Sequence, residues 1–600
     1  NQRNSRMKAT MNQVNQISSD LKENREVYQV KQWLQKFGKA LESARIWELE
    51  DCFSDDAHWR DLLAFTWSIS PFEGRLTISE GLLAFQKDIN ASNFALAHGR
   101  TEPRTVTRLG VDVVEGIFTF ETSLGRGEGV VRLLREEPTK AWIFLTSLFE
   151  LKGHEEKNGP RRPSGEAYSR NFGGSNWLDQ RQSAQAFEDR DPQVLVVGGG
   201  QAGLAIAARL GQLEIDTLVV DKHERIGDNW RKRYHSLALH NQIHVNHLPY
   251  MPFPPTWPKY IPKDMLANWF ESYSEALQIN YWTNSEFISG RYDDNEERWE
   301  ATIRNGEGSH RVMSPKHIIF ANGVSGIPYI PQLPGLQNFK GEVVHSHSFT
   351  HGGSFSGKKV MVLGTGNSGH DVAQDLHSHE VNTTIVQRGS TTVVSIDPSA
   401  KLNYALYDEG PTIDDCDLIA SVATYPLVVK GYQLAVKKMA ELDKELIENL
   451  IRRGFKYDLG EDETGHQMKY RRRGGGYYLD AGCSQLIIDG EINLLQFDNI
   501  KKFIDTGIRC KDGSDIHFDA IILATGYYTQ KELVKRLLGE EVADCVGEIW
   551  GIGADGEMAN MWQKTAQKGL WCTAGSLQEC RIYSKYLALQ IKAMEENLIP

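Results

Sequence analysis

Two segments of this 600-residue chain repeat one local pattern, which constrains the fold more than any other feature of the sequence. In each segment a short apolar run leads directly into a glycine-rich turn, and a helical stretch follows. The first segment spans residues 193–210, and the second spans residues 359 to about 377. A strand, a glycine turn and a helix in this order open a βαβ unit, in which the strands pair in parallel. We therefore expect an α/β protein with two Rossmann-like dinucleotide-binding domains.

The first glycine turn reads GGGQAG at residues 198–203. Gly198 permits a tight turn, Gly200 lets the backbone approach a pyrophosphate, and Gly203 lets the helix pack closely on the strand. The pyrophosphate would lie at the positive end of the helix, where backbone amides are free. A purely structural glycine turn is the weaker alternative, because the preceding strand and the following helix both agree with nucleotide binding.

The second glycine turn has the same spacing and reads GTGNSG. It too follows an apolar strand and precedes a helix. Its expected cofactor-binding residues are Gly364, Gly366, Asn367, Ser368 and Gly369.

The two units differ at the end of their second strand. In the first unit the strand at residues 217–220 ends in Asp221, whose carboxylate would accept hydrogen bonds from ribose hydroxyls and repel a 2′-phosphate. In the second unit Gln387 takes this position, and Arg388 follows it. A guanidinium can pair with the 2′-phosphate that NADP carries and FAD lacks. The first site is therefore predicted to bind FAD and the second NADPH, with an ordinary surface role for Arg388 as the alternative.

Charge and cysteine content exclude several other classes. A net charge of −12 argues against nucleic acid as the main partner. The short basic run at residues 471–473 is interpreted as a solvated loop. Seven scattered cysteines without a Cys-x-x-Cys pair predict neither a metal site nor a redox dithiol. No apolar run is long enough for a transmembrane helix, and the polar N-terminus lacks the core of a signal peptide, so a cytoplasmic location is expected.

Changes in composition along the chain predict its domains. We expect a polar tail at 1–28, an α+β domain at 29–152, a linker at 153–190, an FAD-binding domain at 191–335 and 480–600, and an NADPH-binding domain with a helical insertion at 336–479. The middle of the insertion, residues 398–478, is interpreted as a substrate lid, an oligomer contact or a set of core-facing helices.

The N-terminal domain is predicted from one amphipathic helix and several strands. The helix begins near Val30, and the strands lie at residues 114–121, 129–134 and 142–151. The domain resembles the cone-shaped fold of nuclear-transport-factor-like (SnoaL-type) proteins. Some of those proteins use an Asp–His pair as acid and base, but the acidic stretch around His58 is interpreted as a solvated helix end. Dimerisation or a substrate-shaping role is expected instead.

The region from about residue 190 to residue 600 resembles the flavin-containing (class B) monooxygenases. The segment at 339–349 is similar to the family signature FxGxxxHxxx(W/Y/F), which is more specific than either glycine turn. Further similar segments are the GxxW element at 227–230 and the strand with its ATG turn at 519–527. The nearest branch is that of the YUCCA-like indole-3-pyruvate monooxygenases, to which the segments at 239–254, 258–269, 364–373 and 480–482 are similar.

The resemblance implies an NADPH-dependent FAD monooxygenase. Such an enzyme forms a flavin C4a-(hydro)peroxide and transfers one oxygen atom to a small organic substrate, by N- or S-oxygenation or by oxidative decarboxylation of a 2-oxo acid. His345 would be the signature histidine that positions NADP, and Asn241, aligned with a one-residue shift, would lie near the flavin edge. The further cofactor-binding residues implied are Trp230, Ala524, Thr525 and Gly526.

Other functions remain open at this point. A Baeyer–Villiger outcome shares the same intermediate, although Phe349 stands where that signature has Trp. An NADPH oxidase or reductase without oxygen transfer would use the same cofactors. A disulfide reductase would need a cysteine pair near the flavin, and a non-enzymatic scaffold would not need both glycine turns. The expected partners are a small-molecule substrate and O2, without nucleic acid, and a homodimer is left open.

Overall fold

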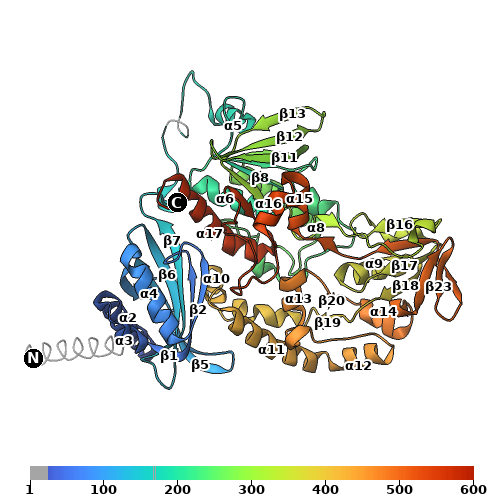
Figure 1. Ribbon diagram of the computed structural model, residues 1–600, viewed down its shortest axis with the longest axis horizontal. Helices are drawn as coiled ribbons and strands as arrows, with labels where there is room; N and C mark the ends of the chain where they lie inside the picture. The colour runs from blue at the N-terminus through green and yellow to red at the C-terminus, as the bar shows by residue number, and fades with distance from the viewer. Residues whose placement is uncertain (1–23, 166–167, 169, 600) are drawn as a thin grey trace, which may run out of the picture. The chain divides into compact units, whose positions relative to one another are not determined.

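The computed structural model describes residues 24–165, 168 and 170–599 (Figure 1), so the expected polar tail lies outside the described residues up to residue 23. The chain divides into two compact units. The first comprises the described residues up to Glu155 together with Gly410–Leu427, and the second comprises Glu156–Glu409 with Val428 onwards. A segment of the expected helical insertion thus belongs to the N-terminal unit.

The first unit is the α+β domain that the sequence predicts, and its expected helix and strands are confirmed. Its sheet has the order β2-β1-β7-β6-β5-β3, with β4 paired to β5, and only β1 and β7 run parallel. The strands are β1 Phe53–Leu62, β2 Ile69–Glu73, β3 Ser92–Leu96, β4 Arg104–Arg108, β5 Val111–Glu121, β6 Gly125–Leu134 and β7 Ala141–Leu151. The helices are α2 Arg25–Ser43, α3 Ile46–Glu50, α4 Arg75–Ile89 and α10 Ile413–Ala420.

Aromatic side chains form the core between α2 and this sheet. The stacked rings of Trp33 and Phe37 lie one helical turn apart on α2, and both contact Phe53 and Phe144 from the sheet. All four side chains are buried. The helical spacing that predicts α2 therefore exists because one face of the helix covers the sheet. The likeness of this unit to the nuclear-transport-factor-like fold stays a prediction.

The acidic stretch around His58, which we expected to be a solvated helix end, is instead part of strand β1. Asp61 is fully buried there and accepts hydrogen bonds from the amides of Phe65 and Thr66 at 3.0 and 2.8 Å and from the Thr146 hydroxyl at 2.5 Å. Burial raises the pKa of Asp61 to about 6 against the effect of these bonds. Because its oxygens are engaged by the protein, Asp61 stabilises the loop after β1.

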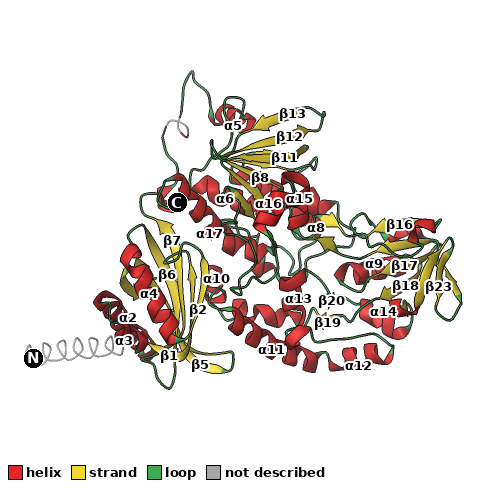
Figure 2. Ribbon diagram, viewed as in Figure 1, coloured by secondary structure: helices red, strands yellow, loops and turns green. Residues whose placement is uncertain are grey.

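The second unit contains two five-stranded parallel sheets, and the predicted strands beside both glycine turns are confirmed (Figure 2). The first sheet has the order β10-β9-β8-β14-β27. Its strands are β8 Val194–Val197, β9 Thr217–Val220, β10 Tyr281–Trp282, β14 His317–Phe320 and β27 Leu570–Cys572. Helix α6, Gln201–Gln212, follows its glycine turn and packs against α17, Leu577–Glu595.

The second sheet has the order β16-β25-β17-β18-β21. Its strands are β16 Glu342–His345, β17 Lys359–Leu363, β18 Asn382–Gln387, β21 Asn493–Gln496 and β25 Ala520–Leu523. Helix α9, Asn367–Ser378, follows the second glycine turn, as expected. Every strand of this sheet is paired in parallel with its neighbours.

One of the expected domain assignments is wrong. Strands β21 and β25 lie in residues 480–600, which we assigned to the first dinucleotide domain, but they pair with β17 and β18 in the second sheet. The chain returns to the first sheet only at β27. The expected linker at 153–190 is also not wholly irregular, because it contains the capped helix α5, Trp177–Ala186.

Smaller elements complete the second unit. The helices are α7 Asp228–Arg231, α8 Lys263–Ala276, α12 Lys444–Arg452, α13 Gly465–Arg473, α14 Cys483–Asp489, α15 Gln530–Leu538 and α16 Glu540–Val546, and α11 Tyr425–Leu442 begins in the first unit. The strands are β11 Ser285–Asp293, β12 Arg298–Asn305, β13 His310–Met313, β15 Ile327–Pro328, β19 Thr392–Ser395, β20 Tyr477–Asp480, β22 Ile500–Ile504, β23 Gly507–Cys510, β24 Asp515–His517 and β26 Tyr527–Tyr528. The 3₁₀-helices are η1 Gly159–Arg161, η3 Ile243–Val245, η4 Leu336–Asn338, η5 Gly352–Phe355, η6 Ala400–Asp408, η7 Glu461–Glu463 and η8 Phe497–Asn499. The basic run at 471–473 is the last turn of α13 and not the loop that we expected. In the described part of the chain, no helix is long and apolar enough to cross a membrane.

Candidate dinucleotide sites and the junction between them

The first glycine turn joins β8 to α6 by very close backbone contacts. Gly198 has a φ of +106°, and a Cβ atom there would lie 2.8 Å from the Ala321 carbonyl oxygen. A Cβ on Gly203 would lie 2.0 Å from the carbonyl oxygen of Gly198. Gly200 would also bring a Cβ to within 2.9 Å of Nδ2 of Asn229. Only glycine fits at Gly198 and Gly203, whereas a Cβ at Gly200 would require only the Asn229 side chain to move, so the turn has the shape that a pyrophosphate-binding loop requires.

Asp221 lies where the sequence predicts it, directly after β9, and it bonds to the first glycine turn. Its Oδ2 accepts a hydrogen bond from the Gly199 amide at 2.7 Å, and its Oδ1 accepts bonds from the amide and ring Nδ1 of His223 at 2.9 and 2.6 Å. Burial raises the pKa of Asp221, but the bonds from His223 and Gly199 outweigh burial and lower it. The carboxylate is therefore ionised and fixed beside the turn, where it would meet a bound nucleotide's ribose.

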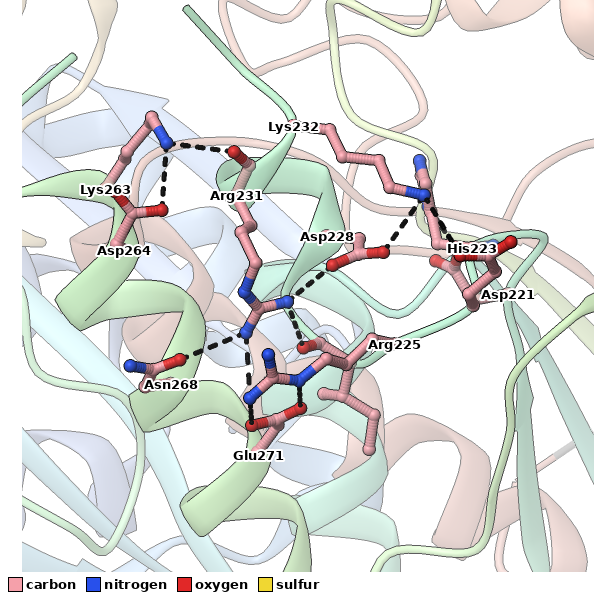
Figure 3. Close-up of polar contacts among 12 residues, drawn as sticks. Asp221, His223, Arg225, Asp228, Arg231, Lys232, Lys263, Asp264, Asn268 and Glu271 are labelled. Carbon is pink, nitrogen blue, oxygen red and sulfur yellow. Dashed lines mark hydrogen bonds and ion pairs between the residues drawn. The ribbon is translucent and has the colours of Figure 1, made fainter. Parts of the chain in front are cut away.

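Figure 3 shows a network of charged side chains that joins α7 to α8. The buried Asp228 forms ion pairs with Arg231 at 2.5 Å and with Lys232 at 3.2 Å. The Nζ atom of Lys263, on α8, donates to the Arg231 carbonyl at 2.9 Å. Trp230, between these residues, donates its indole N–H to the side chain of Gln201 at 3.2 Å. The GxxW element thus connects α8 to the N-terminal end of α6.

The second glycine turn repeats the geometry of the first. Gly364 has a φ of +120°, and a Cβ there would lie 2.3 Å from the Ala524 carbonyl oxygen. A Cβ on Gly369 would lie 2.0 Å from the Gly364 carbonyl oxygen. The side chain of Asn367 accepts a hydrogen bond from the Leu479 amide at 2.8 Å, which joins the start of α9 to β20. These residues also fit a dinucleotide, with the same close approach of helix and strand.

Gln387 is the last residue of β18 and Arg388 follows it, and their two side chains lie in opposite environments. Gln387 is fully buried and exchanges two hydrogen bonds with the backbone of Lys456, at 2.8 and 2.7 Å. Arg388 is exposed and makes no hydrogen bond or ion pair with any residue that the structure describes. A neutral buried amide and an unpaired exposed cation therefore replace the ionised Asp221 of the first unit. This difference is the one that would separate NADPH from FAD.

His345 ends β16 and joins the family signature to the ATG turn. Its Nδ1 accepts a hydrogen bond from the His347 amide at 3.0 Å, so its Nε2 carries the proton and donates to the Gly526 carbonyl at 3.2 Å. Burial lowers the pKa of His345, against the effect of the Gly526 carbonyl. The ring is neutral at pH 7 with both nitrogens engaged, which suits a positioning role better than that of a base. Its edge also faces the ring of Tyr527, with centroids 5.4 Å apart.

The ATG turn itself is held by two further bonds. The Ala524 amide donates to the Leu363 carbonyl at 2.8 Å, and the Thr525 hydroxyl donates to the Tyr329 carbonyl at 2.6 Å. Gly526 has a φ of +85°. The turn therefore borders the second glycine turn and the strand pair β15–β26.

Asn241 lies in the loop before η3, and its side-chain amide donates to the Tyr404 hydroxyl at 3.1 Å. Among the described residues, no hydrogen bond or ring contact joins Asn241 to His345, so the structure does not bring the two expected catalytic residues together directly. The sequence reasoning missed Tyr404 and the α13 residues near it. The insertion that follows the second glycine turn is rich in tyrosine, and this was the signal that could have pointed to them.

The chain matches known proteins over part of its length. Residues 191–406 match the flavin-binding monooxygenase-like family. The probable indole-3-pyruvate monooxygenase YUCCA10 of Arabidopsis thaliana is 30% identical over 336 residues, which are 56% of this chain and 81% of that protein. YUCCA4 of the same plant is 29% identical over 337 residues, which are 56% of this chain and 75% of that protein. A flavin-containing monooxygenase from Stenotrophomonas maltophilia covers 68% of this chain and 99% of its own, with 17% identity and a TM-score of 0.47.

Proposed function

The chain belongs to the flavin-binding monooxygenase-like family and is a flavin-dependent oxidoreductase, and from this premise we propose that it is an NADPH-dependent FAD monooxygenase acting on a small organic substrate. FAD would bind at the first glycine turn, between Gly198 and Gly203, with Asp221 at its ribose. NADPH would bind at the second turn, between Gly364 and Gly369.

The contrast between the ends of β9 and β18 carries this proposal. An ionised, buried Asp221 disfavours a 2′-phosphate, whereas the exposed Arg388 offers an unpaired guanidinium to one. Both turns otherwise share the same close-packed geometry. FAD and NADPH, which differ in charge, would thus bind at different glycine turns of the same chain.

The bound flavin supplies the oxidising group, and the protein's own residues bind, orient and exclude water. His345 would hold the nicotinamide side of the junction, because its two ring nitrogens fix the loop at His347 and the turn at Gly526. Asn241, held by Tyr404, would face the flavin edge. None of these side chains needs to act as a nucleophile.

Oxidative decarboxylation of a 2-oxo acid is the reaction we favour, because the matched relatives are named indole-3-pyruvate monooxygenases. N- or S-oxygenation and a Baeyer–Villiger reaction would use the same cofactors and remain candidates. For the N-terminal unit we propose a nuclear-transport-factor-like fold with a role in dimerisation or in shaping the substrate site, and we propose a cytoplasmic location.

The test is product analysis of the purified holoenzyme. NADPH consumption is measured with indole-3-pyruvate, an amine, a thioether and a ketone under ¹⁸O₂, and each product is examined for one labelled oxygen atom. We expect substrate-dependent consumption of NADPH and incorporation of one atom. Consumption that yields only hydrogen peroxide with every substrate would show an oxidase and refute the proposal.

A further inference from the structure

Arg471 differs from the arginine that follows it in α13. Arg472 donates to Glu461 at 3.1 Å and to Asp462 at 2.6 Å. Arg471 forms no ion pair with a carboxylate of any described residue, and its one hydrogen bond among them joins its Nε to the Tyr432 hydroxyl at 3.0 Å. The half-buried guanidinium therefore keeps both terminal nitrogens available for a ligand.

Glu579, an acid whose charge acts on Arg471, is already engaged elsewhere. Oε2 of Glu579 accepts hydrogen bonds from the Ser576 amide at 2.8 Å and from the Tyr470 hydroxyl at 3.1 Å, as part of the capping box of α17. Tyr432 and, after it, Glu579 raise the pKa of Arg471 against the effect of burial. Arg471 is thus a charged group in a tyrosine-rich environment, and no acid among the described residues forms an ion pair with it.

Helix α13 connects the surroundings of the two glycine turns. On one side, the Gln201 side chain, in the first turn, donates to the Gly575 carbonyl at 3.3 Å, next to the capping box that Tyr470 contacts. On the other side, α13 packs against β20, whose Leu479 amide donates to Asn367 in the second turn (Figure 1). A group on α13 therefore lies near the junction where two bound cofactors would meet.

Tyr404 adds a second polar group to this cluster. Its hydroxyl accepts the bond from Asn241, and burial raises its pKa, so it stays protonated and neutral. The charges of Glu579 and Tyr432 also act on it, which places Tyr404 close to both. Arg471, Tyr432 and Tyr404 thus combine one cation with two hydroxyls, and Asn241 belongs to the same group.

We propose that Arg471, supported by the Tyr432 hydroxyl, binds the carboxylate of the substrate and restricts the enzyme to organic acids such as 2-oxo acids. A planar guanidinium pairs with a carboxylate through two parallel hydrogen bonds, for which its free terminal nitrogens are suited. The proposal rests on the proposed function, because it places the acid between the two cofactors. Arg471 is then a specificity-determining residue.

The test compares two probes that differ by one carboxylate. Phenylpyruvate and phenylacetone are titrated into the FAD-loaded enzyme with NADP⁺ present, and binding is followed by calorimetry. We expect Arg471→Gln to weaken the binding of phenylpyruvate about 10- to 100-fold, the range for a hydrogen bond to a charged group, and to leave the binding of phenylacetone unchanged. Arg473→Gln, which removes an exposed charge paired with Glu461, serves as the control and should change neither.

Binding is measured without turnover, so this experiment is independent of whether oxygen transfer occurs. An enzyme that binds phenylpyruvate through Arg471 but transfers no oxygen would refute only the proposed function. Three results would overturn the role of Arg471: the variant binds both probes equally more weakly, it binds phenylpyruvate as tightly as the unchanged enzyme does, or the unchanged enzyme does not bind phenylpyruvate at all. If Arg471→Gln fails to fold, Arg471→Lys keeps the positive charge but loses the planar guanidinium, and it should still weaken the binding of phenylpyruvate without changing that of phenylacetone.

Discussion

Asp415 anchors the segment at 410–427 within the N-terminal unit, and its removal should release that segment. The carboxylate is 1% exposed and forms an ion pair with Arg100. It also accepts hydrogen bonds from the amide and hydroxyl of Thr101, at 2.8 and 2.5 Å. Asp415→Asn would keep the shape but turn an amide NH₂ toward groups that are themselves donors.

The expected loss is about 3 kcal/mol, at the lower end of the range for a broken buried ion pair. The lower end applies because Arg100 keeps a second acid, Glu128 at 2.7 Å, and so is not left without a partner. About 3 kcal/mol corresponds to roughly 100-fold faster hydrogen exchange through local opening. Mass-spectrometric exchange on peptides from α10 measures this change directly.

Asp414→Asn is the matched control, since Asp414 lies in the same first turn of α10 but is exposed. It should change the opening free energy by less than about 0.5 kcal/mol. The Asp415 effect also has a defined pH dependence: burial raises the pKa of Asp415, but the bonds from Thr101 and Arg100 lower it overall. Its stabilisation is therefore complete above the unfolded pKa of about 3.9 and lost as pH falls through the lower folded value. Equal exchange in both variants at pH 7 would refute the reasoning.

Three further outcomes test the cofactor sites. Gly203→Ala should abolish or greatly reduce FAD content after purification, because its Cβ would lie 2.0 Å from a backbone oxygen, whereas Gly211→Ala in the same helix meets nothing within 4 Å and should retain FAD. Arg388→Ala should weaken the binding of NADPH by about 1.5–3 kcal/mol and the binding of NADH only slightly. Lys501→Ala, which removes another exposed charge, should change the binding of neither cofactor. An equal loss of affinity for both cofactors in Arg388→Ala would contradict the assignment. Because the pKa of His345 is lowered from 6.5, the affinity for NADPH should be constant from about pH 7 to 9 and should decline only below about pH 6.5. The variant His345→Gln should not show this decline. An unchanged pH profile in that variant would count against the positioning role.

Local pattern predicted the parts of this fold that depend on neighbouring residues. The strands at β8, β9 and β17, both glycine turns and the helices after them follow from short apolar runs and glycine spacing, and all are confirmed. The contrast between Asp221 and Arg388 was also readable, because each side chain directly follows a strand of known direction. These features are encoded within about 30 residues each.

Long-range pairing was not readable in the same way. Strands β21 and β25 are four-residue segments like many others in the chain, and only their pairing with β18 and β17 assigns them to the second sheet. The acidic stretch that includes Asp61 looked solvated, although the tertiary structure buries Asp61 against Thr146. Parallel pairing and burial depend on residues far away in the chain, and a local pattern carries no information about them.

The sequence by itself thus determined two dinucleotide folds whose second strands lead into different groups, Asp221 in one and Gln387 with Arg388 in the other, because glycine spacing and a strand-end acid are local requirements of nucleotide binding. Only the tertiary structure decided which residues meet between those folds. Arg471 and Arg472 are adjacent and chemically identical, yet one is paired with acids and the other is directed toward tyrosines. Successive positions on a helix project in different directions, so the packing of α13 against the rest of the unit decides which arginine is available to a substrate.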